Sequence, residues 1–147
     1  MSTNSTLTNT SFMKQVILCP FSQTTYSTIK NQMPFNDIMI NNLKLIDDIG
    51  KLDDNWDGYD APGFVVKESL IRFCKEIVSC LGFNQPSIFP TARKSIQMEY
   101  EKNNGEYLEF EILEINKISY FQIRTDKQEI EKELSSIAEL KEIVFAF

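Results

Sequence analysis

Apolar residues recur with the period of a helix in two consecutive stretches of the chain. Over residues 37–49 they follow one helical face, and Gly50 can end that helix. Over residues 66–81 they again recur at helical spacing, and Gly82 stands where a left-handed C-cap belongs. The pattern therefore predicts two helices in the first half of the chain.

From residue 95 onward the apolar spacing changes to two, which is the period of a strand. Apolar and polar residues alternate over 95–101 and 107–112, and Asn104-Gly105 lies between these stretches. An Asn-Gly pair between alternating segments is typical of a β-hairpin. A turn around Asn116 then leads to a third predicted strand over 118–123, which completes an antiparallel meander.

A final helix is predicted after the strands. Asp126, with Glu129 three residues later, resembles a capping box, and the helix would carry Ile130, Leu134 and Ile137 at helical spacing. The apolar residues 143–147 at the end of the chain are expected to be buried as a short strand.

Helices and strands are therefore segregated along the chain, which predicts an α+β fold. It comprises two helices, a three-stranded antiparallel meander and a C-terminal helix, preceded by an irregular N-terminal arm. Residues 83–94 are expected to form a connection. A length of 147 residues suits one domain. We expect residues 1–36 to form a flexible or partner-ordered arm and residues 37–147 to form a single α+β domain.

The amino-acid composition excludes several kinds of catalytic, metal and phosphate-binding site. The sequence contains no histidine, which excludes the usual catalytic triads and most zinc sites built from this chain alone. Cys19, Cys74 and Cys80 lack C-x-x-C spacing and are expected to be reduced. The glycines are scattered, so no phosphate-binding loop can be written. We therefore expect no enzymatic activity and no cofactor.

The charge is unevenly distributed. The net charge is -6, and no Asp or Glu precedes Asp37. A long basic stripe is missing, so nucleic acid is not expected as a direct ligand, whereas a basic partner would be attracted. The apolar run 16–21 is too short for a signal sequence or a membrane span. We expect a cytoplasmic protein that binds no membrane.

One loop resembles the first half of a calcium-binding EF-hand loop. From residue 53 it reads D-x-N-x-D-G, but Phe64 occupies the position that needs a bidentate Glu. The alternative is a carboxylate-rich turn in which Trp56 is a packing anchor. The oxygen ligands for calcium or magnesium would be Asp53, Asn55, Asp57 and Asp60.

The same loop carries a family resemblance. Residues 55–62 read N-W-D-G-Y-D-A-P and precede a helix, Pro90 and the acidic hairpin. This arrangement resembles a group of small, uncharacterised bacterial proteins that pair a W-D-G-x-G-A turn with such a sheet. The likeness covers residues 52–123, with Asp60 replacing the usual Gly and Tyr100 replacing a common Trp. The group has no established activity, so the resemblance implies a fold rather than a function.

The second candidate site is an acidic face of the predicted hairpin. If the two alternations pair as the turn predicts, its carboxylates lie opposite the apolar side chains, on a solvated face. Three interpretations stay open: a solvated face, a docking surface for a basic partner, or a paired carboxylate site. The candidate partner-binding residues are Glu99, Glu101, Glu109, Glu111, Trp56 and Tyr59.

These observations favour a small acidic interaction module that binds a basic protein partner. It would be antitoxin-like, immunity-like or an accessory subunit, with contacts through the acidic face and the N-terminal arm. The first alternative is a carboxylate-only divalent-metal-binding protein or metal-dependent enzyme. The second is a nucleic-acid mimic.

Overall fold

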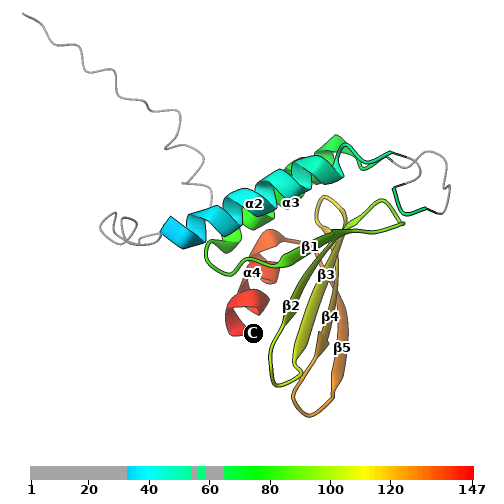
Figure 1. The fold of residues 1–147 in the computed structure, drawn as a ribbon. Helices are drawn as coiled ribbons and strands as arrows, with labels where there is room; N and C mark the ends of the chain where they lie inside the picture. Colours follow the sequence, from blue (N-terminus) through cyan, green and yellow to red (C-terminus); the bar gives the residue numbers. More distant parts are fainter. Residues whose placement is uncertain (1–32, 54–55, 59–64) are drawn as a thin grey trace, which may run out of the picture. The chain divides into compact units, whose positions relative to one another are not determined.

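The computed structural model describes residues 33–53, 56–58 and 65–147. The chain divides into two compact units, Met1–Gln32 and Met33–Phe147, and every described residue belongs to the second (Figure 1). The described elements are, in chain order, α2 (Met33–Ile49), α3 (Glu68–Leu81), β1 (Ser87–Pro90), β2 (Ile96–Glu101), β3 (Tyr107–Glu114), β4 (Lys117–Ile123), β5 (Glu129–Leu134) and α4 (Ile137–Ala146).

The strands form one five-stranded sheet in the order β1-β2-β3-β4-β5, and every neighbouring pair is antiparallel. This arrangement confirms the predicted α+β class. The Asn-Gly turn between β2 and β3 is also confirmed, because the backbone N–H of Gly105 donates to Lys102 O at 3.0 Å. Gly105 has a φ of +83° and Asn116, in the next turn, has a φ of +57°. Asn and Gly tolerate this left-handed conformation better than other residues do.

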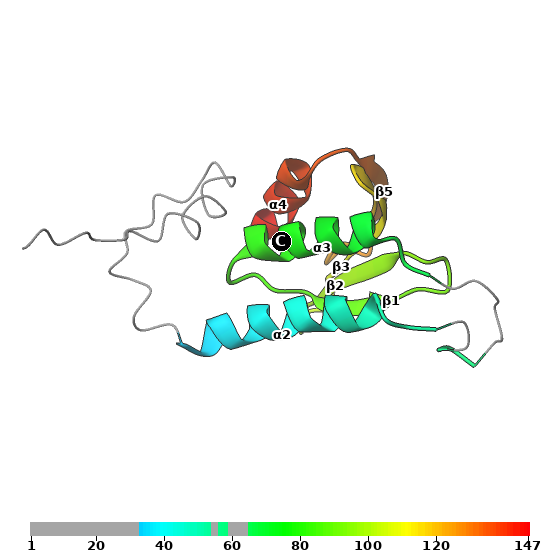
Figure 2. The same ribbon diagram turned by 90° about the horizontal axis from the view of Figure 1, so that it is seen from above.

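The helices pack against one face of the sheet, which we call the inner face. α3 lies between α2 and α4 and contacts β3, while α2 packs beside α3 and next to β1 (Figure 2). Asn42 fastens α2 to the segment before β1, because its Nδ2 donates to Gln85 Oε1 and to Pro86 O at 3.0 Å each. The opposite face of the sheet, the outer face, is covered by no helix among the described elements (Figures 1 and 2).

The hydrophobic core lies between the helices and the inner face. α3 contributes most of the helical part, which its strong helical spacing of apolar residues explains. Its buried residues are Leu70, Ile71, Phe73, Cys74, Ile77, Val78 and Leu81. The strands contribute the alternating inner positions. Their buried residues are Ile88, Ile96, Met98, Leu108, Phe110, Ile112, Ile118, Tyr120 and Leu134.

The expectation of three strands is incomplete, because the sheet has one additional strand at each edge. Residues 83–94 were expected to form only a connection, yet Ser87–Pro90 pairs with β2 as β1. The two prolines of this segment favoured the prediction of a connection, because proline is rare inside strands. Pro90 can end β1 because an edge strand leaves one side of its backbone without a ladder partner.

The predicted final helix begins in the wrong place. Residues 129–134 form strand β5, and the helix starts only at Ile137. Ile130 and Leu134 are four residues apart, a spacing that fits one face of a helix and one face of a strand equally well. Pairing with β4 along the whole of β5 favours the strand. The expected short strand over 143–147 is also wrong, because α4 extends to Ala146, and the expected burial fails at Phe145, which is 57% exposed.

The start of one helix needs a smaller correction, and two of the cysteines lie in α3. α2 begins at Met33, earlier than expected, and its Pro34 lies in the first turn, where proline is tolerated. Cys74 is buried and unbridged, and burial raises the pKa of its thiol. Cys80 is half-buried near the end of α3, and Cys19 lies outside the described residues. No helix in the described ranges is long and apolar enough to cross a bilayer.

Candidate functional site

The ladder register places the predicted acidic residues together on the outer face. Glu99 lies directly opposite Glu109 across β2 and β3, and Glu101 lies opposite Tyr107. The register also pairs Met98 with Phe110, whose side chains are buried on the inner face. The separation of charged and apolar sides in this hairpin therefore follows the sequence prediction.

Strand β5 extends this acidic surface, which the sequence did not predict because these residues were assigned to a helix. Phe121 of β4 lies opposite both Glu109 and Glu131, so one row crosses the sheet from β2 to β5. The period-two spacing of the β5 glutamates was the signal that could have revealed them. The glutamates that β5 adds to the outer face are Glu129, Glu131 and Glu133.

Two aromatic rings lie among these carboxylates. The rings of Tyr107 and Phe121 have centroids 6.3 Å apart and are tilted by 59°. The Tyr107 hydroxyl donates to Glu109 Oε2 at 2.7 Å. Burial, followed by the hydrogen bonds to Glu109 and Glu99, raises the pKa of Tyr107. Both rings are half-buried, so they present apolar surface beside the charges.

Glu111 differs from the other outer-face glutamates, because it is only 5% exposed. The turn between β1 and β2 folds over its carboxylate. Arg93 and Ser95 both donate to it, and Ser95 lies 2.5 Å from Thr91 Oγ1. Glu111 therefore holds this turn in place, and its charge is neutralised from within the chain. We leave it out of the surface that a partner could contact.

The remaining carboxylates have no such neutralisation. Strand alternation places one cationic side chain of β4, Lys117, on the outer face, where it lies opposite Glu114. Within the described part of the chain, the ion pairs involve other acids or Glu111. The glutamates that we define as the acidic face, none of which forms an ion pair with a described residue, are Glu99, Glu101, Glu109, Glu129, Glu131 and Glu133.

The candidate metal loop is described only in part. Asp53 is exposed, Asp57 is half-buried, and Trp56 is half-buried and packs against the core. The packing of Trp56 fits its predicted role as an anchor. The positions of Asn55, Asp60 and Tyr59 lie outside the described residues. Among the residues that are described, no group of three or more acidic or cysteine side chains is arranged to hold a metal, so the loop site stays a prediction.

The arrangement of the acidic face suits binding through charge better than it suits proton transfer. Carboxylates on a solvated sheet face repel one another across the ladder, and a cationic surface can relieve this repulsion. Half-buried aromatic rings between them can contact the flat faces or stems of Arg and Lys side chains. A comparison of the chain with protein families, curated proteins and solved structures finds no match, so this geometry is the basis for any functional proposal.

Proposed function

We propose that this protein is a small interaction module whose acidic face binds a basic protein partner. The observation that carries the proposal is the row Glu99, Glu109, Phe121 and Glu131, which crosses four adjacent strands on the face that no described helix covers. Charge complementarity of this kind raises association rates and selects partners of opposite charge.

The rings of Tyr107 and Phe121 give the acidic face apolar contact area in addition to its charge. Exposed ion pairs contribute only about 0–1 kcal/mol each, because water screens them. A partner that covers Tyr107 and Phe121 would also bury apolar area and exclude water from the surrounding carboxylates. Interfaces typically concentrate their binding energy in such central aromatic positions, with a polar rim around them. We infer that the Tyr107–Phe121 pair is the centre of the contact.

The proposal is tested by comparing two triple variants that carry the same change in net charge. The first removes charge from the row on the sheet, through Glu99→Gln, Glu109→Gln and Glu131→Gln. Each variant is immobilised and exposed to a lysate of the source cell, and the proteins retained stoichiometrically are identified. We expect a basic partner that the wild type retains and that the first variant binds about tenfold more weakly, which corresponds to about 1.4 kcal/mol.

The second variant is the control, because its substitutions lie on helices: Glu68→Gln, Glu76→Gln and Glu142→Gln. All three side chains are exposed. This variant should retain the partner as the wild type does. Equal losses in both variants would show that only net charge matters and would contradict a specific face. If double-stranded DNA competes with this protein for the captured partner, the result would instead favour the hypothesis that the acidic face mimics nucleic acid.

A further inference from the structure

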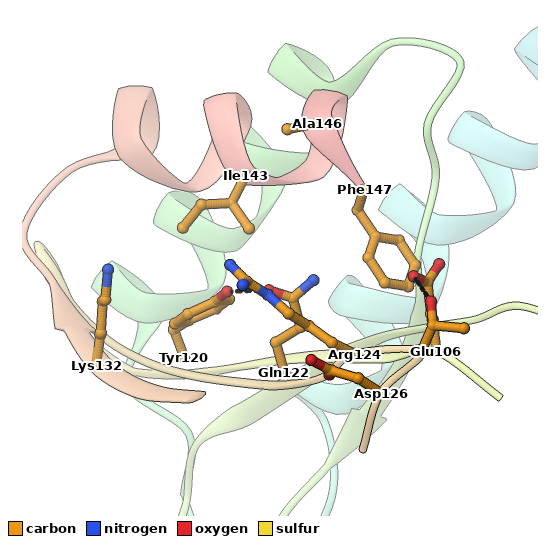
Figure 3. A pocket seen from close by; sticks show the side chains of 10 residues that line it. Glu106, Tyr120, Gln122, Arg124, Asp126, Lys132, Ile143, Ala146 and Phe147 are labelled. Atoms are coloured by element: carbon orange, nitrogen blue, oxygen red, sulfur yellow. Dashed lines mark hydrogen bonds between the residues drawn. The ribbon is translucent and has the colours of Figure 1, made fainter. Parts of the chain in front are cut away.

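A pocket lies on the inner side of the sheet, away from the acidic face. It has a volume of about 650 Å³ and lies between α4 and the strands β4 and β5. Figure 3 shows Ile143 of α4 and Phe147, the residue after α4, on the helix side of the pocket. Tyr120 and Gln122 of β4 and Arg124, the residue after β4, lie on the sheet side. This volume falls within the range of about 300–1,000 Å³ that is usual for small-molecule sites.

The side chains of the inner face change from apolar to polar at this pocket. Ile118 and Tyr120 of β4 are buried in the core, but the next inner position along the strand is Gln122. On β5, Leu134 is buried, and the inner position that follows toward the pocket is Lys132, which lies opposite Tyr120. Alternation predicts apolar residues at these positions. Polar donors replace them on the part of the sheet that faces α4 across the pocket, and they line the pocket.

The polar side chains that reach this pocket leave hydrogen-bond donors unused. The Tyr120 hydroxyl donates to Gln122 Oε1 at 2.6 Å, which leaves the amide nitrogen of Gln122 without an acceptor among the described residues. Arg124 donates through Nη1 to Gln128 Oε1 at 3.3 Å and keeps its other N–H groups. Lys132 forms no hydrogen bond or ion pair with any described residue.

The carboxylates that line the pocket already accept hydrogen bonds. Glu106 accepts hydrogen bonds from Thr125 Oγ1 at 2.5 Å and from Lys102 Nζ at 2.9 Å. These bonds lower the pKa of Glu106 to about 2, so it stays ionised and bound to its own donors. Asp126 accepts from the backbone N–H of Gln128 at 3.0 Å. Glu106 is therefore occupied by its own donors, whereas Asp126 keeps one carboxylate oxygen, Oδ2, without a hydrogen-bond partner among the described residues. The donors that remain free in the pocket are the amide of Gln122 and the cationic groups of Arg124 and Lys132.

The opposite wall of the pocket is apolar. Ile143 and Phe147 are half-buried and pack against the core, and Ala146 lies between them in the sequence. Phe147 is held in place by Tyr100, whose ring centroid lies 6.4 Å away, and by Lys102 Nζ, which lies 4.1 Å from the centre of its ring. A ligand in the pocket would thus meet fixed apolar side chains on one side and cationic donors on the other.

We propose that this pocket binds a small organic anion whose negative group contacts Gln122, Arg124 and Lys132 and whose apolar group contacts Ile143 and Phe147. Guanidinium and ammonium groups form charge-assisted hydrogen bonds with a carboxylate, and these are stronger than hydrogen bonds between neutral groups. The site is independent of the acidic face, because the two lie on opposite sides of the sheet.

The test uses 2-naphthoate as the anionic probe and 2-naphthalenemethanol as its uncharged counterpart. Each is titrated into the full chain labelled with ¹⁵N, and the amide resonances are followed by NMR. We expect saturable shifts from 2-naphthoate at Gln122, Arg124, Lys132 and Ile143. The alcohol should bind at least about tenfold more weakly, since it lacks the charge that the donors recognise. Equal affinity for the two probes, or shifts centred elsewhere, would overturn the proposal.

Substitutions then locate the charge requirement. Arg124→Gln combined with Lys132→Gln should weaken 2-naphthoate binding at least about tenfold and leave binding of the alcohol within about twofold. The control, Lys44→Gln combined with Lys117→Gln, removes the same charge elsewhere and should change neither affinity. Equal weakening by both variants would contradict the site. Arg124 and Lys132 are exposed, so we expect the double variant to fold. If its NMR spectrum shows that it does not, each single variant is titrated instead.

Discussion

At the scale of single residues, the opposed carboxylates of Glu99 and Glu109 work against folding. Like charges directly opposite in an antiparallel ladder destabilise it, and pair effects in a ladder are about 0.2–1 kcal/mol. Glu109→Gln removes one charge but keeps an oxygen that can accept from Tyr107. We expect the free energy of unfolding at pH 7 to rise by about 0.2–1 kcal/mol, measured by urea denaturation.

The control for this residue is Glu142→Gln, which removes an exposed charge from α4. It should leave the free energy of unfolding nearly unchanged. A loss of stability in Glu109→Gln would contradict the expectation and would mean that the charged hydrogen bond from Tyr107 outweighs the repulsion. A gain limited to Glu109→Gln would show that the sheet keeps a destabilising charge, as binding surfaces often do.

Residue identity alone could place Glu99, Glu101 and Glu109 on the outer face, because strand alternation fixes which side a residue takes. It could not distinguish Glu111, whose alternation is the same. The difference arises from Arg93 and Ser95, which reach Glu111 only after β1 pairs with β2 and the turn between them folds over the sheet. Local sequence patterns do not contain this long-range contact.

At the scale of elements, the sequence predicted those whose apolar spacing fits one period and misassigned those that fit two. α3 and the β2–β3 hairpin have an unambiguous period. β5 does not, because Ile130 and Leu134 suit either structure, and the partner strand β4 decides the outcome. The acidic surface of β5 was missed for the same reason.

The true start of α4 gives a prediction for an element. Ser136 Oγ accepts from the backbone N–H of Glu139 at 3.2 Å, and Glu139 Oε2 accepts from the backbone N–H of Ser135 at 2.8 Å. Ser136→Ala removes this N-cap and should lower the free energy of unfolding by about 1 kcal/mol. Asp126→Ala, at the cap expected from sequence, should cost less, since Asp126 accepts one hydrogen bond in a turn. Chemical denaturation compares the two, and a larger loss in Asp126→Ala would contradict this assignment.

At the scale of the whole molecule, the two sides of the sheet carry different charge. The six glutamates of the acidic face form no ion pair with a described residue, whereas the inner pocket presents Arg124 and Lys132 beside Glu106 and Asp126. The chain also carries a net charge of -6. Repulsion within the acidic face should therefore exceed the attraction within exposed pairs such as Lys51–Asp48, whose Nζ and Oδ1 atoms lie 2.8 Å apart.

This imbalance predicts that salt stabilises the protein. The Debye length falls from about 30 Å at 0.01 M to about 10 Å at 0.1 M ionic strength, so added NaCl screens the repulsion between carboxylates. We expect the free energy of unfolding to rise between these concentrations, and to rise less in the variant that combines Glu99→Gln, Glu109→Gln and Glu131→Gln. The helix-surface variant Glu68→Gln, Glu76→Gln and Glu142→Gln should retain most of the wild-type salt response. A free energy of unfolding that falls with NaCl in the wild type would mean that attraction within the exposed ion pairs dominates, and would remove the physical reason for a cationic partner to be favoured.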